Sequence, residues 1–190
     1  AQASGCDLFV TSELAICGYC PDDLLQRPQF YAAVLAQLNR LLTIQNITML
    51  IGCPHHEDGV NYNSVFVITN GSIIHRYDKW LLPNYGVFDD KRYFTPGTEA
   101  CVFVCRGIKV GIVICEDIWN SGPAMATKSL GADILCVLNA SPYSLNKHEE
   151  RIVELGNLVL QELNLPIVYV NQCGGQDELV FDGASFVMNS

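Results

Sequence analysis

The chain has 190 residues and a formal net charge of −9; 49% of its residues are hydrophobic and only 16% are charged. This length and composition favour one domain, or part of one, with a sizeable core. The acidic balance argues against a nucleic-acid surface, which needs clustered lysine and arginine, and no apolar run reaches the roughly 18 residues of a membrane span.

In the first half of the chain, apolar runs alternate with turn signals. Residues 47–53 form a continuous apolar run, which is typical of a strand covered on both faces. Asn70-Gly71 lies between two strand-like runs and is a strong signal for a β-hairpin. The elements expected here are strands at 7–12, 47–53, 65–69 and 72–77 and a helix at 28–45.

The second half repeats this alternation. Arg106-Gly107 marks a second hairpin, and the glycine-rich stretch at 174–177 is predicted to be a turn with positive backbone angles. The order of elements mixes helical crossovers with hairpins, which implies a mixed sheet with helices on one or both faces. The elements expected here are strands at 100–105, 108–115, 133–139, 166–171 and 184–188 and helices at 122–131 and 147–163.

Nine cysteines are many for a chain of this size. Most lie inside apolar runs, where cysteine behaves as a small hydrophobic residue. Their odd number, their irregular spacing and the lack of a signal-peptide pattern favour reduced thiols. We therefore expect a cytoplasmic protein.

Three reactive side chains follow apolar strand runs. Cys115 ends one run and is followed by two acids, Glu13 comes after another, and Lys79 comes after a third. The carboxyl ends of strands are where α/β proteins place reactive groups. A thiol, a carboxylate and an ammonium at three strand ends can supply a nucleophile, a base and a cation in one cleft.

These three groups suit the cleavage of a carboxamide. Glu13 would take the thiol proton and later protonate the leaving ammonia, while Lys79 and the backbone N–H of Glu116 would face the oxyanion. A lysine beside the sulfur would also favour thiolate over thiol.

The segments around these residues resemble the motifs of the nitrilase superfamily of carbon-nitrogen hydrolases. Within it they are most similar to the glutaminase domains of glutamine-dependent NAD synthetases. The superfamily is marked by SELAICGY, DKWLLPNYGVFDDKRYF and GIVICEDIW. The strings more specific to this branch are LPNYGVFD and GGQDELVFDG, and NASPYSLNKHEER and VNQCGGQDELVFDGASFV extend the likeness over nearly all of the chain.

The resemblance implies an α/β fold, a nitrilase-type α-β-β-α sandwich with a mixed β-sheet core. It implies that residues 1–190 are one glutamine amidohydrolase domain, which we expect to be incomplete at both ends. Glu13 would be the general base, Lys79 the oxyanion-stabilising lysine and Cys115 the nucleophile that forms a glutamyl thioester from L-glutamine.

In the family, the released ammonia reaches a C-terminal NAD synthetase domain. ATP, Mg and deamido-NAD are expected there, and no cofactor or metal is expected in this domain, which lacks a glycine-rich phosphate loop. The family is expected to pack two such domains back to back in a four-layer arrangement, so a homo-oligomer is also expected.

The resemblance also implies a glutamine pocket. Either Lys147 or Arg151 could pair with the substrate carboxylate. Where relatives carry Asp-Glu, this chain has Asp89-Asp90, which leaves the role of Asp90 open. The residues that match pocket positions are Tyr85, Glu116, Trp119, Ser141 and Lys147.

Two alternatives remain open. A stand-alone nitrilase-type amidase would lack a synthetase sequence downstream. A non-catalytic thiol or redox module would use Cys17 and Cys20, which have C-x-x-C spacing, and would react first at these two thiols with an electrophile.

Overall fold

Two mixed β-sheets pack face to face in the structure, a computed structural model that describes residues 1–189, with the side chains at positions 121, 159 and 160 left out. The first sheet has the order β1-β2-β3-β4, and the second has the order β11-β8-β7-β6-β5. The strands of the first sheet are β1 (Leu8–Val10), β2 (Thr48–Glu57), β3 (Val60–Thr69) and β4 (Ser72–Asp78); those of the second are β5 (Cys101–Cys105), β6 (Ile108–Ile114), β7 (Ile134–Asn139), β8 (Ile167–Asn171) and β11 (Phe186–Met188).

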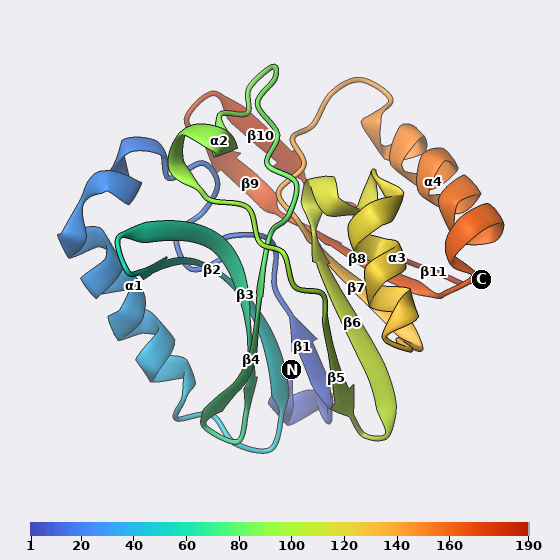
Figure 1. Cartoon of the computed structure of the whole chain (residues 1–190), viewed down its shortest axis with the longest axis horizontal. Coiled ribbons are helices and arrows are strands. Elements are labelled where there is room, and N and C mark those ends of the chain that lie inside the picture. Colours follow the sequence, from blue (N-terminus) through green and yellow to red (C-terminus); the bar gives the residue numbers. More distant parts are fainter. Residues whose placement is uncertain (190) are drawn as a thin grey trace.

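Helices cover the outer faces of both sheets (Figure 1). Helix α1 packs on the first sheet, and α3 and α4 pack on the second. The helices are α1 (Pro28–Leu41), α2 (Asp90–Tyr93), α3 (Ser121–Ser129) and α4 (Lys147–Leu158). The expected α-β-β-α sandwich is therefore confirmed. The expectation that two domains supply its four layers is wrong, because one chain forms all four.

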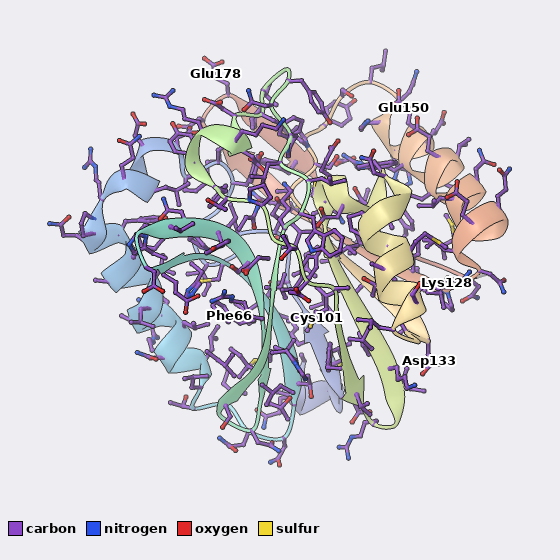
Figure 2. All side chains as sticks on the ribbon, in the orientation of Figure 1. Phe66, Cys101, Lys128, Asp133, Glu150 and Glu178 are labelled. Carbon is purple, nitrogen blue, oxygen red and sulfur yellow. The ribbon has the colours of Figure 1, made fainter. Side chains whose placement is uncertain are left out.

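Strand β2 shows why the layers hold together. Its residues Thr48–Pro54 are all buried, as the continuous apolar run predicts. Successive side chains of a strand point to opposite faces, so Leu50 packs between the sheets while Met49 and Ile51 pack beneath α1. Figure 2 shows the same division: Phe66 belongs to the α1 layer and Cys101 to the core between the sheets.

Several boundaries differ from the sequence prediction. Helix α1 ends at Leu41 because the chain turns at residues 42–46, where Asn46 has a φ of 60°. The helix predicted at 147–163 is α4 followed by a π-helical turn, Val159–Leu163. The short helix α2 was not predicted. No helix among residues 1–189 has both the length and the apolar character needed to traverse a bilayer.

The glycine-rich segment is mainly strand. Cys173–Gln176 forms β9, which pairs with β10 (Leu179–Asp182) as a two-stranded hairpin. The predicted turn is therefore wrong for residues 174–176, but the predicted positive backbone angles are confirmed at Gly174, with a φ of 129°, and at the turn residue Asp177, with a φ of 50°. The hydrogen bonds between β9 and β10 pair the backbone N–H and C=O groups of this segment. The glycine content of the sequence does not predict this pairing.

Candidate active site

The three reactive residues follow strands whose carboxyl ends lie at the same end of the sandwich (Figure 1). Glu13 lies beyond β1, Lys79 directly follows β4, and Cys115 directly follows β6. Strand β1 is parallel to β2, and β4 has the direction of β2 because two antiparallel pairings separate them. The strand topology thus brings distant parts of the sequence to one edge.

The segment that carries Glu13 packs tightly on β2. A side chain at Gly52 would collide with the Ser12 carbonyl oxygen and come within 2.7 Å of the Leu14 amide nitrogen, so glycine permits this approach. Glu13 itself is 1% exposed. Its Oε2 accepts a hydrogen bond from the Ala140 N–H at 3.0 Å, which orients the carboxylate.

Lys79 joins two buried carboxylates. Its Nζ donates to Glu13 Oε1 at 2.7 Å and to Asp90 Oδ2 at 2.7 Å. Burial by itself lowers the pKa of Lys79, but the charges of Glu13 and Asp90 hold that pKa well above its ordinary value. The side chain is therefore a permanent cation.

Asp90 has the role that the sequence left open. It is buried at the start of α2, and its Oδ1 accepts a hydrogen bond from the Tyr19 hydroxyl at 2.8 Å. Its Oδ2 reaches Lys79 although aspartate is one methylene shorter than glutamate.

Cys115 occupies a sharp turn from β6 into a 3₁₀ helix, Cys115–Ile118. Its φ of 44° lies in the left-handed region, which costs energy in a non-glycine residue and is concentrated at functional sites. The same strained strand-to-helix turn presents the nucleophile in other hydrolase folds.

The Cys115 thiol lies close enough to the Glu13–Lys79 pair for both of their charges to shift its pKa. Burial raises the pKa of Cys115 well above its ordinary value, the negative charge of Glu13 raises it further, and the positive charge of Lys79 lowers it. The expectation that lysine would favour a thiolate is therefore outweighed by burial. The combined effect favours the protonated form of the resting sulfur.

The residues predicted for substrate binding form three groups. The Tyr85 hydroxyl donates to Glu116 Oε2 at 2.8 Å, and Tyr85 is 58% exposed. The Lys147 ammonium lies 5.8 Å from the centre of the Trp119 ring and also pairs with Glu150 at 3.2 Å.

Ser141 is buried beside Arg151, which is fully buried as well. Arg151 Nη1 binds both oxygens of Asp182 at 2.9 and 3.0 Å, and its Nη2 donates to the carbonyls of Ser141 and Pro142. This guanidinium is thus committed to holding the loop after β7. Lys147 is left as the candidate partner for a substrate carboxylate.

Sequence reasoning missed Asn63 and Tyr19. The Asn63 Nδ2 donates to Glu13 Oε1 at 2.8 Å, and the backbone carbonyl of Asn63 accepts the backbone N–H of Lys79 at 2.9 Å. Asn63 looks like an ordinary polar strand residue, so no local signal marks it. Within residues 1–189, no three or more His, Cys, Asp or Glu side chains are grouped to hold a metal ion.

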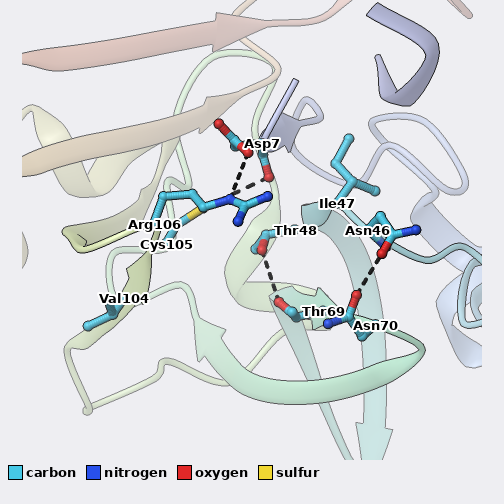
Figure 3. A pocket seen from close by; sticks show the side chains of 9 residues that line it. All are labelled: Asp7, Asn46, Ile47, Thr48, Thr69, Asn70, Val104, Cys105 and Arg106. Carbon is cyan, nitrogen blue, oxygen red and sulfur yellow. Dashed lines mark hydrogen bonds and ion pairs between the residues drawn. The ribbon is translucent and has the colours of Figure 1, made fainter. Parts of the chain in front are cut away.

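A separate pocket of about 310 Å³ lies at the opposite end of the strands (Figure 3). It is lined by residues just before β1, by residues before and at the start of β2, and by the ends of β3 and β5 with the turns that follow them. Arg106 pairs there with Asp7 at 2.8 Å, and both side chains are largely exposed. None of the three reactive residues lines this pocket, so the volume of a pocket does not by itself identify the candidate active site.

The fold and the clustered residues define a nitrilase-type sandwich. The structure superposes on the glutamine-dependent NAD⁺ synthetase of Acinetobacter baumannii with a TM-score of 0.94 and 43% identity, over 99% of this chain and 36% of that one. It also matches the NitN amidase of Neterenkonia sp. AN1, with a TM-score of 0.85 and 25% identity, over 100% of this chain and 74% of that one.

Residues 1–190 match the family described as carbon-nitrogen hydrolase, and the chain belongs to that family. Among curated relatives, the glutamine-dependent NAD(+) synthetase of Acinetobacter baylyi is 42% identical over 190 residues, which are 100% of this chain and 35% of the relative. That of Thermotoga maritima is 41% identical, over 100% of this chain and 34% of the relative. The chain thus spans about a third of the length of these relatives.

Proposed function

We propose that this chain is the glutamine amidohydrolase domain of a glutamine-dependent NAD synthetase. The observation that carries the proposal is the contact of Lys79 with Glu13 at 2.7 Å beside the strained, buried Cys115. Names of relatives about 40% identical over the whole chain support glutamine as the amide donor.

Hydrogen-bond capacity supports Glu13 as the base. A carboxylate has about four lone-pair sites. Oε1 of Glu13 accepts from Asn63 and Lys79, whereas Oε2 accepts only from the Ala140 N–H among the groups that the structure describes. One site on Oε2 is therefore free to take the Cys115 proton as the sulfur attacks the amide carbon.

Lys79 has the capacity to stabilise the oxyanion. An ammonium has three donors, and two of them bind Glu13 and Asp90. The third donor and the Glu116 N–H face the oxygen that becomes negative when the C–S bond forms, an effect worth on the order of 3 kcal/mol per donor. As the carbonyl reforms, the C–N bond breaks, and protonated Glu13 returns its proton to the leaving ammonia.

The glutamyl thioester on Cys115 is then hydrolysed. Glu13 takes a proton from water, the hydroxide adds to the thioester carbon, and the C–S bond breaks. The sulfur regains the proton from Glu13, and glutamate leaves. Tyr85, Glu116, Trp119, Ser141 and Lys147 are proposed to bind the rest of the glutamine.

The proposal extends to a C-terminal NAD synthetase domain that receives the ammonia. ATP, Mg and deamido-NAD would bind that domain, and no cofactor is assigned to residues 1–190. We further propose a cytoplasmic homo-oligomer; nine free thiols favour a reducing compartment.

The test is the Cys115→Ala variant. It is expected to abolish glutamine hydrolysis and, in an enzyme that includes the synthetase domain, to leave ammonia-driven NAD formation intact. A glutamine-analogue electrophile should label Cys115 alone, and Cys173→Ala, which removes an exposed thiol, serves as the control. Glutamine hydrolysis near the wild-type rate in Cys115→Ala would show that the nucleophile is misassigned. Labelling first at Cys17 or Cys20 would favour a thiol module.

A further inference from the structure

Asp117 is a completely buried carboxylate to which the proposed reaction assigns no role. Four donors converge on it. Its Oδ1 accepts the Trp80 N–H at 3.1 Å and the Leu81 N–H at 2.8 Å. Its Oδ2 accepts the Tyr77 hydroxyl at 2.8 Å and the Ile114 N–H at 3.1 Å.

The positions of these donors are informative. Tyr77 and Trp80 lie on either side of Lys79 in the chain. Ile114 directly precedes Cys115, and Asp117 follows it by two residues. The Asp117 carboxylate therefore links the turn around Cys115 to the segment that carries Lys79.

We propose that Asp117 is a positioning residue that fixes the Lys79 segment against the Cys115 turn, so that the ammonium faces the oxyanion formed at the sulfur. This inference rests on the proposed glutamine hydrolysis. Asp117 touches neither Cys115 Sγ nor Lys79 Nζ by any hydrogen bond among residues 1–189, so it acts through the backbone.

The chemistry of the four contacts explains why an acid is needed. All four partners donate, so both oxygens must accept two hydrogen bonds each, and only a carboxylate does so. Asparagine has nearly the same shape, and the Tyr77 hydroxyl can turn to accept from its NH₂ group, but the Ile114 N–H would face that NH₂ group and lose its acceptor. An Asp117→Asn substitution therefore breaks the hydrogen bond to Ile114, beside Cys115, while it preserves the volume of the side chain.

The experiment compares Asp117→Asn with wild type in glutamine hydrolysis, at a temperature where both are folded. We expect kcat to fall about 10- to 100-fold, as small misplacements of reacting groups do. KM should change less than about twofold, because Asp117 does not contact substrate. Tyr77→Phe removes one of the four donors and should lower kcat by less than Asp117→Asn does.

The matched control is Asp133→Asn. Asp133 also accepts a backbone N–H, that of Lys109, at 2.8 Å, but it lies at the other end of the second sheet. Its kcat should equal that of wild type. If Asp117→Asn lowers thermal stability while kcat stays within about twofold of wild type, or if KM alone rises, Asp117 is only structural and the proposal is wrong.

Amide hydrogen exchange separates this inference from the proposed function, because it needs no substrate. In Asp117→Asn, exchange should rise at Ile114, whose N–H loses its acceptor, and stay unchanged at Lys109. Unchanged exchange at Ile114 would overturn the positioning role of Asp117 even in an active enzyme. A wild-type protein that fails to hydrolyse glutamine would overturn the proposed function. In that case, amide hydrogen exchange and the rate of Cys115 alkylation would decide whether Asp117 holds the Cys115 turn.

Discussion

Asp90 offers a sharp test of the buried ion cluster. Its carboxylate binds the Lys79 ammonium and the Tyr19 hydroxyl, and all three side chains are buried. In Asp90→Ala, the ammonium loses one of two anions and the hydroxyl loses its acceptor. Breaking a buried ion pair from one side typically costs about 3–5 kcal/mol.

Asp90→Asn should be milder. Its amide oxygen can accept from Lys79, and its NH₂ can donate to the Tyr19 oxygen, so the number of hydrogen bonds is nearly kept while the charge is lost. Hydrogen bonds to charged groups contribute about 1.5–3 kcal/mol and neutral ones about 1 kcal/mol, so we expect a loss of about 1–2 kcal/mol. In both variants Lys79 should be drawn toward Glu13, and kcat should fall at least about tenfold.

Urea unfolding monitored by tryptophan fluorescence measures these free energies, and an ammonia-release assay measures kcat. Asp89→Ala is the control. Asp89 is next to Asp90 in the chain, but its carboxylate is exposed and lies 3.6 Å from Arg92, and an exposed ion pair of this kind contributes less than about 1 kcal/mol. If Asp90→Ala is no less stable than Asp90→Asn, or if both match Asp89→Ala, the argument from a buried charge cluster is refuted.

Three further predictions follow from the contacts and the pKa shifts. Asn63→Ala removes a donor from the Glu13 carboxylate and should cost about 1–3 kcal/mol in unfolding free energy and lower kcat; an unchanged kcat would show that Glu13 needs no such support. Arg151→Lys keeps the charge but loses the fork that holds Asp182 and the Ser141 carbonyl, so KM for glutamine should rise more than kcat falls; equal KM values would contradict this. Burial raises the pKa of Cys53 and of Cys136 to about 12. Above the ordinary thiol pKa of about 9 the unfolded chain therefore releases protons that the folded chain keeps, and the unfolding free energy should fall by about 1.4 kcal/mol per pH unit for each thiol. Substituting Cys53 and Cys136 by alanine should remove their share of that slope and leave the share of the other buried thiols, a difference that urea titrations between pH 8.5 and 10 can detect.

Local patterns in the sequence predicted most of the strands and placed the three candidate reactive residues after them, and the resemblance of the surrounding segments to nitrilase motifs then singled these residues out. Glu13, Lys79 and Cys115 could be found because each follows an apolar run, and a run of this kind is visible in a window of a few residues. The continuous run at 47–53 likewise indicated a strand that is covered on both faces. These features depend on side-chain periodicity, which the sequence records directly.

Other features depended on contacts between distant residues. Asn63 binds Glu13 50 positions away, and Asp90 binds Tyr19 71 positions away. Three of the four donors to Asp117 lie 36 to 40 positions away. Arg151 looks like a solvated residue near a helix start, yet β10 supplies Asp182 and buries it.

The sequence by itself thus determined the class of fold and most strand positions, and it indicated the three candidate reactive groups. Only the tertiary structure decided which second carboxylate holds Lys79, which cation stays available for a substrate, and that burial keeps the Cys115 sulfur protonated. The physical reason is that hydrogen bonding, ion pairing and desolvation depend on distances in space. Those distances are set when the two sheets pack, and no local pattern of residues encodes them.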